Sequence, residues 1–329
     1  MLRHPDSRTT PGPSPAAPAA FPAWARPAKA PESDAEAAYL AGAALSRLDT
    51  VVRENSPWAG VLRRRLTLSA AAANGRRAGR AEDEAALRDA FHLTRPGADP
   101  GPAGKRLLAW RELPARSVGH WRSSFHAATE FLGVPHDRAL QQAVDAAEAC
   151  AAGDRPAPFA AAQVFGVAQR ALAPNPGRQR LGGRGGEGEL LAAWLADAVL
   201  ARRLKWPFAL PLLAAALFSG GARQARGDVA DGAEGAIVFA YANGAARACD
   251  LSAELGRRAQ KLQDAAPKLR AKGAPAALAA LLDEDSLSAS SKIGGQISER
   301  GARRLFDRLV ALGAVRELTG RATFRLYGL

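Results

Sequence analysis

Apolar residues recur every three or four positions through most of this chain, a spacing typical of helices that bury one face. Residues 34–54 give the clearest example, because their apolar side chains fall on one broad face. Strand signals are almost absent before Val315, so the body is predicted to be all-α. Further helices are expected near residues 57–68, 82–92, 105–111, 120–132, 137–151, 158–172, 189–203, 207–218, 235–262 and 276–282.

The segment from Ser298 to Gly313 predicts an amphipathic helix with clear ends. Ser298 is a favourable N-cap, and Gly313 is a favourable stop signal. Gly294-Gly295 separates this helix from a short one before it, as the tight turn between two crossed helices requires. The apolar face is predicted to consist of Ala302, Leu305, Phe306, Leu309 and Leu312.

Two β-prone runs, residues 315–318 and 323–327, follow that helix and flank the turn residues 319–322, so they predict a hairpin. The order helix, turn, helix, hairpin is that of a winged helix-turn-helix, whose first helix would be residues 276–282. The predicted fold class is therefore all-α: a multi-helix body with a C-terminal winged helix-turn-helix of three helices plus a small β-hairpin.

Composition divides the chain into three regions. Residues 1–33 are rich in Pro and Ala and are predicted to form a disordered tail. Residues 34–266 are predicted to form an all-helical domain, in which the Pro- and Gly-rich residues 173–188 are a candidate internal linker. Residues 267–329 are the predicted winged helix-turn-helix domain.

The net charge of +13 favours polyanionic partners such as nucleic acid. Part of that charge is attributable to codon bias in a GC-rich genome, since 38 Arg stand against 7 Lys among many Ala and Gly. A helix in the major groove needs long donors for phosphates and guanine edges, and a wing meets the backbone or the minor groove. The predicted contacts with double-stranded DNA are Ser298, Arg300, Arg303, Arg304 and Arg308 from the helix, with Arg321 and Arg325 from the wing.

Two further features bear on this prediction. Helix-turn-helix proteins commonly bind as dimers matched to two half-sites, so a homodimer is the default expectation. A second basic stretch lies along and after the second predicted helix, and either contacts phosphates as an auxiliary surface or forms a solvated helix face. That stretch consists of Arg63, Arg64, Arg65, Arg76, Arg77 and Arg80.

Residues with catalytic or ligand-binding potential are scattered. Gly183–Gly188 matches GxGxxG formally, but no predicted strand precedes it, as dinucleotide binding requires. His120, His126 and His136 form a loose group without the tightly spaced ligand pairs of zinc sites. Asp197 and Asp250 lie inside apolar helices and are either a buried carboxylate pair or single polar residues on helix edges.

No HExxH, Walker loop or GxSxG motif is present, so the sequence predicts no catalytic residue, cofactor or metal site. The favoured interpretation is a regulatory DNA-binding protein. One alternative is a non-enzymatic helical scaffold whose winged domain binds protein, since residues 284–329 carry five acidic groups beside eight basic ones. A second alternative is an enzyme with a site in the helical body.

The location is predicted to be cytoplasmic. Cys150 and Cys249 lie far apart and belong to no CxxC, which is typical of free thiols in a reducing compartment. Prolines interrupt the N-terminus, so it is not a convincing signal peptide. The longest apolar run, residues 206–218, contains two prolines and is too short to span a bilayer, so no membrane contact is expected.

The chain resembles a bacterial family catalogued as domain of unknown function 1403. The resemblance covers about residues 22–329 and rests on residues 302–321 and 324–329, with support from residues 58–60, 82–92 and 195–204. It implies no particular activity. The C-terminal end also resembles, more loosely, the DNA-binding domain that follows Fic-type domains, but no His-Pro-Phe occurs in the chain, so adenylyl transfer is not implied.

Overall fold

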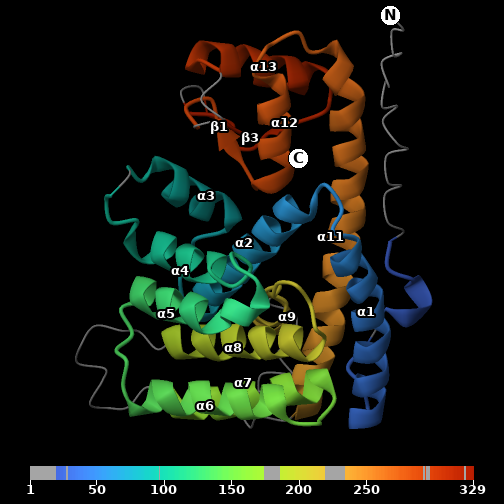
Figure 1. The fold of residues 1–329 in the computed structure, drawn as a ribbon, viewed down its shortest axis with the longest axis vertical. Coiled ribbons are helices and arrows are strands. Elements are labelled where there is room, and N and C mark those ends of the chain that lie inside the picture. The colour runs from blue at the N-terminus through green and yellow to red at the C-terminus, as the bar shows by residue number, and fades with distance from the viewer. Residues whose placement is uncertain are drawn as a thin grey trace, which may run out of the picture.

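A computed structural model of the chain describes residues 20–26, 29–95, 97–173, 186–218, 234–291, 293, 297–321 and 324–329. Helices dominate these residues, and a small sheet lies near the C-terminus (Figure 1). In chain order the elements are η1 (Ala23–Ala25), α1 (Asp34–Glu54), α2 (Ala59–Arg77), α3 (Glu84–Leu93), α4 (Gly101–Arg111), η2 (Val118–His120), α5 (Trp121–Leu132), α6 (Arg138–Ala152), α7 (Ala157–Ala171), α8 (Glu187–Arg203), α9 (Leu213–Phe218), α11 (Glu234–Ala265), η4 (Ala266–Lys268), α12 (Ala274–Asp283), β1 (Leu287–Ser288), α13 (Glu299–Ala311), β2 (Arg316–Glu317) and β3 (Leu326–Gly328).

The helical body predicted from the periodicity is confirmed, and several helix ends are set by capping side chains. The Ser33 hydroxyl accepts a hydrogen bond from the Glu36 N–H at the start of α1 (3.2 Å), and the Asp83 carboxylate accepts from the Ala86 N–H at the start of α3 (2.8 Å). Such caps satisfy N–H groups that have no partner within the helix. Among the described residues, no helix is both long enough and apolar enough to cross a membrane.

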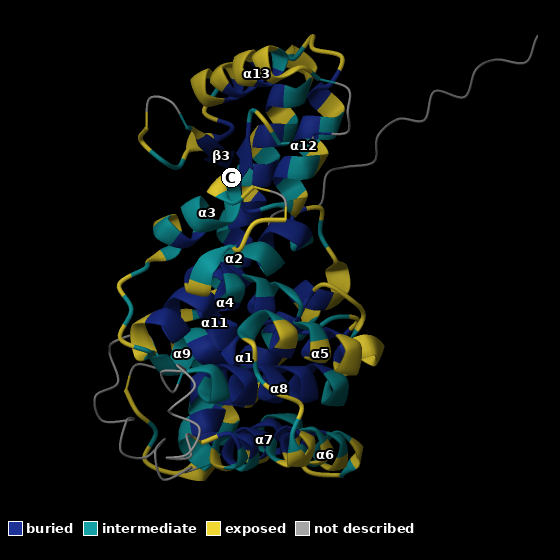
Figure 2. Ribbon diagram, turned by 90° about the vertical axis from the view of Figure 1, so that its left-hand side faces the viewer, coloured by how far each residue is buried: buried dark blue, intermediate teal, exposed yellow. Residues whose placement is uncertain are grey.

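The helices stack in layers that meet the long helix α11. Helices α6 and α7 lie side by side at one end, α8 packs on α7, and α1 runs along α11 (Figure 1). Residues 190–201 of α8 are all buried, so this helix forms the centre of the body (Figure 2). A helix that is apolar all round is stable only when neighbours cover every face, as they do here.

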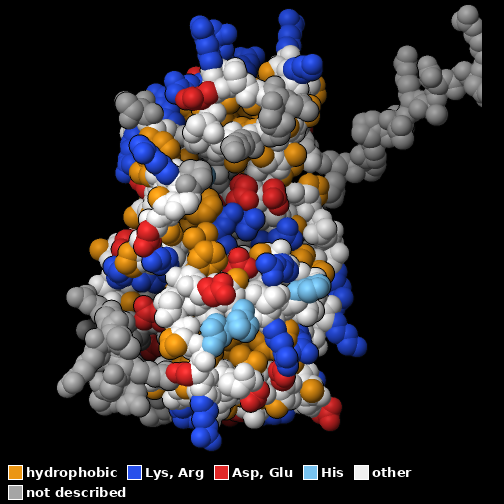
Figure 3. Space-filling model, turned by 60° about the vertical axis from the view of Figure 1, so that its left-hand side comes forward, with side chains coloured by type: hydrophobic (Ala, Val, Ile, Leu, Met, Phe, Trp, Pro, Cys, Tyr) orange, Lys and Arg blue, Asp and Glu red, His pale blue; other side chains and the backbone are white. Residues whose placement is uncertain are grey.

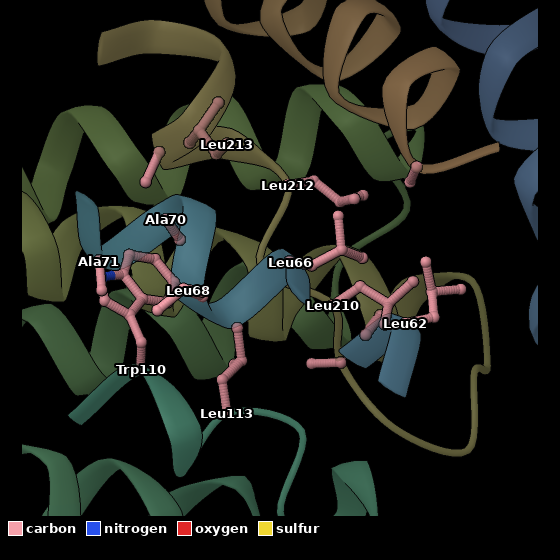
Figure 4. Packing of buried hydrophobic residues seen from close by; sticks show 14 of the residues in the cluster. Leu62, Leu66, Leu68, Ala70, Ala71, Trp110, Leu113, Leu210, Leu212 and Leu213 are labelled. Carbon is pink, nitrogen blue, oxygen red and sulfur yellow. The ribbon is translucent and has the colours of Figure 1, made fainter. Parts of the chain in front are cut away.

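Helix α2 connects this body to the C-terminal elements. In the buried core, its apolar side chains Leu62 and Leu66 lie near Leu210, and Leu68 lies near Trp110 (Figure 4). Further along the chain, α12 packs against α2, which places the C-terminal elements on the end of the body that also carries α3. Helix α2 therefore packs both against the core of the helical body and against α12.

Residues 206–212 differ from the prediction of a helix over 207–218. Only residues 213–218 are helical, as α9, and the preceding stretch is non-helical although Ala209, Leu210 and Leu212 are buried. Pro207 and Pro211 explain the difference, because proline lacks an N–H and disfavours helical geometry in the residue before it. The segment passes so close to α11 that a Cβ added at Gly244 would lie 2.7 Å from the Leu212 carbonyl oxygen.

The C-terminal sheet has three antiparallel strands in the order β1-β3-β2. The antiparallel pairing of the predicted hairpin is confirmed, because Arg316 pairs with Gly328 and Glu317 with Tyr327. The second strand begins at Leu326 and not at residue 323, so the connection is longer than the predicted turn at residues 319–322. Strand β1, in which Leu287 pairs with Tyr327, was not predicted.

The short helix expected before Gly294 is absent from residues 284–291, where β1 and a turn are found; residues 292 and 294–296 lie outside the described residues. Serine side chains explain this. The Ser291 hydroxyl accepts a hydrogen bond from the Ser288 N–H (2.9 Å), and the Ser288 and Ser290 hydroxyls are 2.9 Å apart. Such local bonds compete with helix formation.

Residues 20–26, which the composition predicted to be disordered, instead pack onto α11. Phe21 and Ala25 are buried, and the Phe21 N–H donates to Asp250 Oδ1 (3.2 Å). Both terminal nitrogens of Arg26 also donate to the Asp250 carboxylate, at 2.8 and 3.0 Å. Residues 1–19 and 27–28 of the predicted tail and residues 174–185 of the candidate linker lie outside the described residues.

Candidate nucleic-acid interface

Helix α13 lies at one end of the molecule with a fixed orientation. Its inner face is buried through Ala302, Leu305, Phe306 and Leu309, and the Phe306 ring stacks on Tyr327 of β3 with centroids 4.6 Å apart. The predicted cap is present, because the Ser298 hydroxyl accepts from the Gly301 N–H (3.2 Å). The opposite face of the helix is exposed (Figure 2).

Three predicted contact residues form a stripe along the exposed face. Arg300, Arg304 and Arg308 are four residues apart, which places them on successive turns of one helix face. All three are exposed, and none forms an ion pair with another described residue. Lys and Arg side chains project from the end of the molecule that carries α13 (Figure 3).

The other three predicted arginines have acidic partners. Arg303 pairs with Glu299 one turn earlier on α13, and Arg325 lies 3.8 Å from Asp307. Arg321, expected at a free wing tip, instead forms an ion pair with Asp89 of α3 (2.6 Å). The hairpin loop therefore contacts the helical body through this pair.

Another basic segment, residues 268–272, leads to the start of α12 and was not predicted as part of the interface. A Cβ added at Gly273 would lie 2.8 Å from Ile297, so the loop before α12 contacts the residues that lead into α13. The exposed side chains of Lys268, Arg270 and Lys272 belong to that loop. Three cations in five residues were the available signal, but only the fold shows that Gly273, which follows them, contacts Ile297 before the α13 cap.

An ion-pair cluster joins the C-terminal elements to the helical body. Arg65 of α2 and Arg88 of α3 both pair with Asp285, and the Arg88 contact measures 2.5 Å. Arg64 and Arg111 pair with Glu284, at 3.1 and 2.9 Å. We refer to these four arginines and two acids as the interdomain cluster. Its members come from α2, α3, α4 and the segment between α12 and β1.

The Asp285 part of the interdomain cluster is shielded from solvent, whereas Arg64 and Glu284 are half-buried. Asp285 is only 6% exposed. Burial lowers the pKa of Arg65 from its usual value, while the charge of Asp285 opposes that shift. His92 Nε2 and the Ser286 hydroxyl share a hydrogen bond at the edge of the cluster (2.9 Å), and burial lowers the pKa of His92. These ion pairs give Arg64 and Arg65 a structural role, whereas the sequence had left open a role as auxiliary phosphate contacts.

Two more arginines of that basic stretch contact the protein itself. Arg77 donates twice to the Glu189 carboxylate, at 3.0 and 2.9 Å, and the Arg63 guanidinium lies 4.4 Å from the centre of the Phe208 ring. These contacts fit a structural role better than an auxiliary nucleic-acid surface. The predicted cations that are left for a ligand therefore lie mainly on α13.

Asp197 and Asp250 do not share a site, because they have different partners. Asp197 is fully buried and accepts hydrogen bonds from the N–H groups of Leu212 (3.0 Å) and Leu213 (3.3 Å) at the start of α9. Burial raises its pKa well above the usual value. Asp250 is bound by Arg26, whose hydrogen bond lowers the Asp250 pKa. Asp197 thus satisfies the backbone of a buried non-helical segment.

The three histidines do not form one group either. The His126 and His136 rings stack with centroids 4.1 Å apart, whereas His120 Nδ1 shares a hydrogen bond with Ser117 (2.9 Å). Within the described part of the chain, no group of three or more His, Cys, Asp or Glu is arranged to hold a metal ion.

The two cysteines are free, as expected, and burial raises the pKa of Cys249 to about 12, which argues against a reactive thiolate there. Residues 183–185 of the GxGxxG match lie outside the described residues, and Glu187 and Gly188 belong to the first turn of α8.

These observations define a mostly helical protein with a small three-stranded C-terminal sheet and an arginine-bearing helix exposed at one end. The family described as "Protein of unknown function (DUF1403)" matches residues 14–329, and the chain belongs to that family. The resemblance seen in the sequence is therefore confirmed. Comparison with curated proteins gives no match.

Proposed function

We propose that this protein binds double-stranded DNA through α13, and that residues 267–329 act as a winged helix-turn-helix. The observation that carries the proposal is the exposed stripe of Arg300, Arg304 and Arg308, which have no ion-pair partner among the described residues. A cytoplasmic location, a regulatory role and a homodimer matched to two half-sites belong to the same proposal.

The arrangement of the C-terminal elements supports the winged-helix part of the proposal. Helix α13 precedes an antiparallel hairpin, and the first strand of the unit pairs with the last strand of that hairpin. The buried Phe306 fixes the rotation of α13, so that its arginine stripe faces outward. A recognition helix must present one face to the groove while the other is held by the domain.

Three cations in the loop before α12 support a DNA-contacting surface that extends beyond α13. Lys268, Arg270 and Lys272 precede Gly273, which contacts Ile297 directly before the α13 cap. Such a cluster on one surface is typical of phosphate contacts that position a protein on DNA.

Replacing Arg304 and Arg308 together with alanine should weaken binding to mixed-sequence duplex DNA at least about tenfold at low salt, because two phosphate contacts would be lost. The slope of log affinity against log salt should fall by about two. Fluorescence anisotropy of the full-length chain over several salt concentrations measures both quantities.

The matched control is the double variant Arg116→Ala with Arg170→Ala, which changes the net charge equally at exposed positions away from α13. Equal losses in the two double variants would mean that α13 is not the contact surface. If the wild-type chain binds no duplex at low salt, a winged domain that binds protein becomes the leading alternative. Full-length variants are preferable to truncation at Leu282, which would remove both acids of the interdomain cluster.

Arg321 gives a separate prediction about the wing. Its ion pair with Asp89 competes with any phosphate contact, so Asp89→Ala should raise DNA affinity about threefold by freeing the guanidinium. The exposed Glu130→Ala variant changes the net charge equally and serves as the control in the same anisotropy titration. If Asp89→Ala and Glu130→Ala behave alike, Arg321 does not contact DNA.

A further inference from the structure

A pocket of about 320 Å³ lies between α5 and α6, at the end of the helical body remote from α13. Its lining includes Trp121, Phe125 and His126 from α5, together with His136, Arg138 and Gln141 from the start of α6 and the residues before it. Pockets that bind small organic ligands begin at about 300 Å³. The DNA-binding proposal does not use these residues.

The floor of the pocket is aromatic and held in place. Trp121 is 6% exposed and Phe125 is 2% exposed, with ring centroids 6.4 Å apart. Phe125 in turn packs on Trp194 of the central helix α8, with centroids 5.3 Å apart. These rings are therefore anchored in the core and preorganised, and the small exposed part of Trp121 is what they leave for a ligand.

One wall is formed by the stacked rings of His126 and His136, which lie nearly parallel at an angle of 14°. His136 is oriented by a hydrogen bond between its Nε2 and the hydroxyl of the buried Thr129 (3.3 Å). Two flat rings at the mouth of an aromatic pocket favour a flat ligand. Histidine and hydrophobic side chains lie close together on the face that carries α5 (Figure 3).

The charges around the pocket favour an anion. Arg138 is exposed at the rim and forms no ion pair with a described residue, and the Arg202 guanidinium lies 5.7 Å from the centre of the Trp121 ring. Arg122, also in the lining, pairs with Glu148. The one acid in the lining, Asp137, accepts hydrogen bonds from the N–H groups of Ala139 and Leu140, both 3.0 Å, and so is occupied in capping α6.

We propose that this pocket binds a small aromatic carboxylate. The ring of the ligand lies against Trp121 and the histidine pair, and its carboxylate meets the Arg138 guanidinium at the rim. An aliphatic acid would lack the ring contact, and a neutral aromatic molecule would lack the ion pair. Binding should therefore require both parts of the ligand.

The test uses 2-naphthoate as the probe on the full-length chain, with isothermal titration calorimetry at constant ionic strength. The neutral analogue 2-naphthylmethanol and the non-aromatic cyclohexanecarboxylate should each bind at least about tenfold more weakly. Arg138→Ala should weaken 2-naphthoate binding about fivefold and leave 2-naphthylmethanol unchanged, since it removes only the charge contact.

His126→Ala should weaken both aromatic ligands, because it removes part of the ring wall. Arg170→Ala, an exposed position on α7 outside the pocket, is the charge-matched control and should change nothing. Thermal melting by circular dichroism checks that each variant is folded. The proposal is overturned if 2-naphthoate shows no binding at millimolar concentration, or if Arg138→Ala and His126→Ala leave its affinity unchanged.

Discussion

Replacing Asp285 with asparagine should lower the free energy of unfolding by about 3–5 kcal/mol, because it removes the carboxylate that two shielded guanidinium groups share and leaves Arg88 only its longer ion pair with Glu84 (3.7 Å). Asp285 is 6% exposed and pairs with both Arg65 and Arg88. Asparagine keeps the shape of the side chain, so the loss would come from charge and not from a cavity. Chemical denaturation followed by circular dichroism measures the change.

The control for this prediction is Asp307→Asn, which removes an exposed carboxylate 3.8 Å from Arg325 on the same C-terminal unit. Exposed ion pairs contribute about 0–1 kcal/mol, so this variant should unfold close to the wild type. Similar midpoints for the two variants would contradict a stabilising role for the interdomain cluster. A two-step transition in Asp285→Asn alone would mean that the cluster couples the C-terminal unit to the body.

Replacing Asp197 with alanine should cost on the order of 3 kcal/mol, because two buried N–H groups lose their acceptor. These donors belong to Leu212 and Leu213, where the non-helical segment enters α9. Asp197→Asn should cost less, since the amide oxygen still accepts a hydrogen bond. Urea denaturation of the two variants at neutral pH measures both losses, and equal stability of Asp197→Ala and the wild type would contradict the assigned role.

The stability contributed by Asp197 should also depend on pH. Burial raises its pKa in the folded state, so the folded chain keeps this proton over a range in which the unfolded chain, with a pKa near 3.9, has lost it. The contribution is therefore fully present below about pH 3.9 and is lost as the pH rises through the folded-state pKa. Asp197→Asn has no such proton. The wild type should thus lose stability relative to Asp197→Asn as the pH rises above about 3.9; no change in that difference would contradict the raised pKa.

Much of the helical structure follows from local sequence signals. The periodicity of residues 34–54 predicts the bounds of α1, and Ser298 with Gly313 predicts the ends of α13 to within two residues. Both helices combine an amphipathic pattern with a favourable N-cap, and these signals act within a few residues of one another. The antiparallel pairing of β2 and β3 was also predictable, because the two β-prone runs are close in sequence, but the connection between Glu317 and Leu326 is longer than the predicted turn.

The errors involve contacts between distant residues. Strand β1 was missed because Leu287 pairs with Tyr327, which lies forty residues further along the chain. The segment before α9 was predicted as helix although Pro207 and Pro211 disfavour one, and only the fold shows that the distant Asp197 accepts the N–H groups of Leu212 and Leu213. Residues 20–26 were expected to be disordered because their composition does not reveal the ion pair between Arg26 and Asp250.

In the candidate nucleic-acid interface, too, some features follow from local sequence and others from contacts between distant residues. The sequence by itself determined that α13 would form, which side would be buried and that arginines would lie on the other, because helical geometry fixes faces from spacing. Only the tertiary structure decided which cations are left for a ligand. It pairs Arg321 with Asp89 and Arg65 with Asp285, and it brings Gly273 beside Ile297 and His126 over His136. Ion pairs and ring contacts depend on distances between segments, and those distances are set by the packing of the whole core.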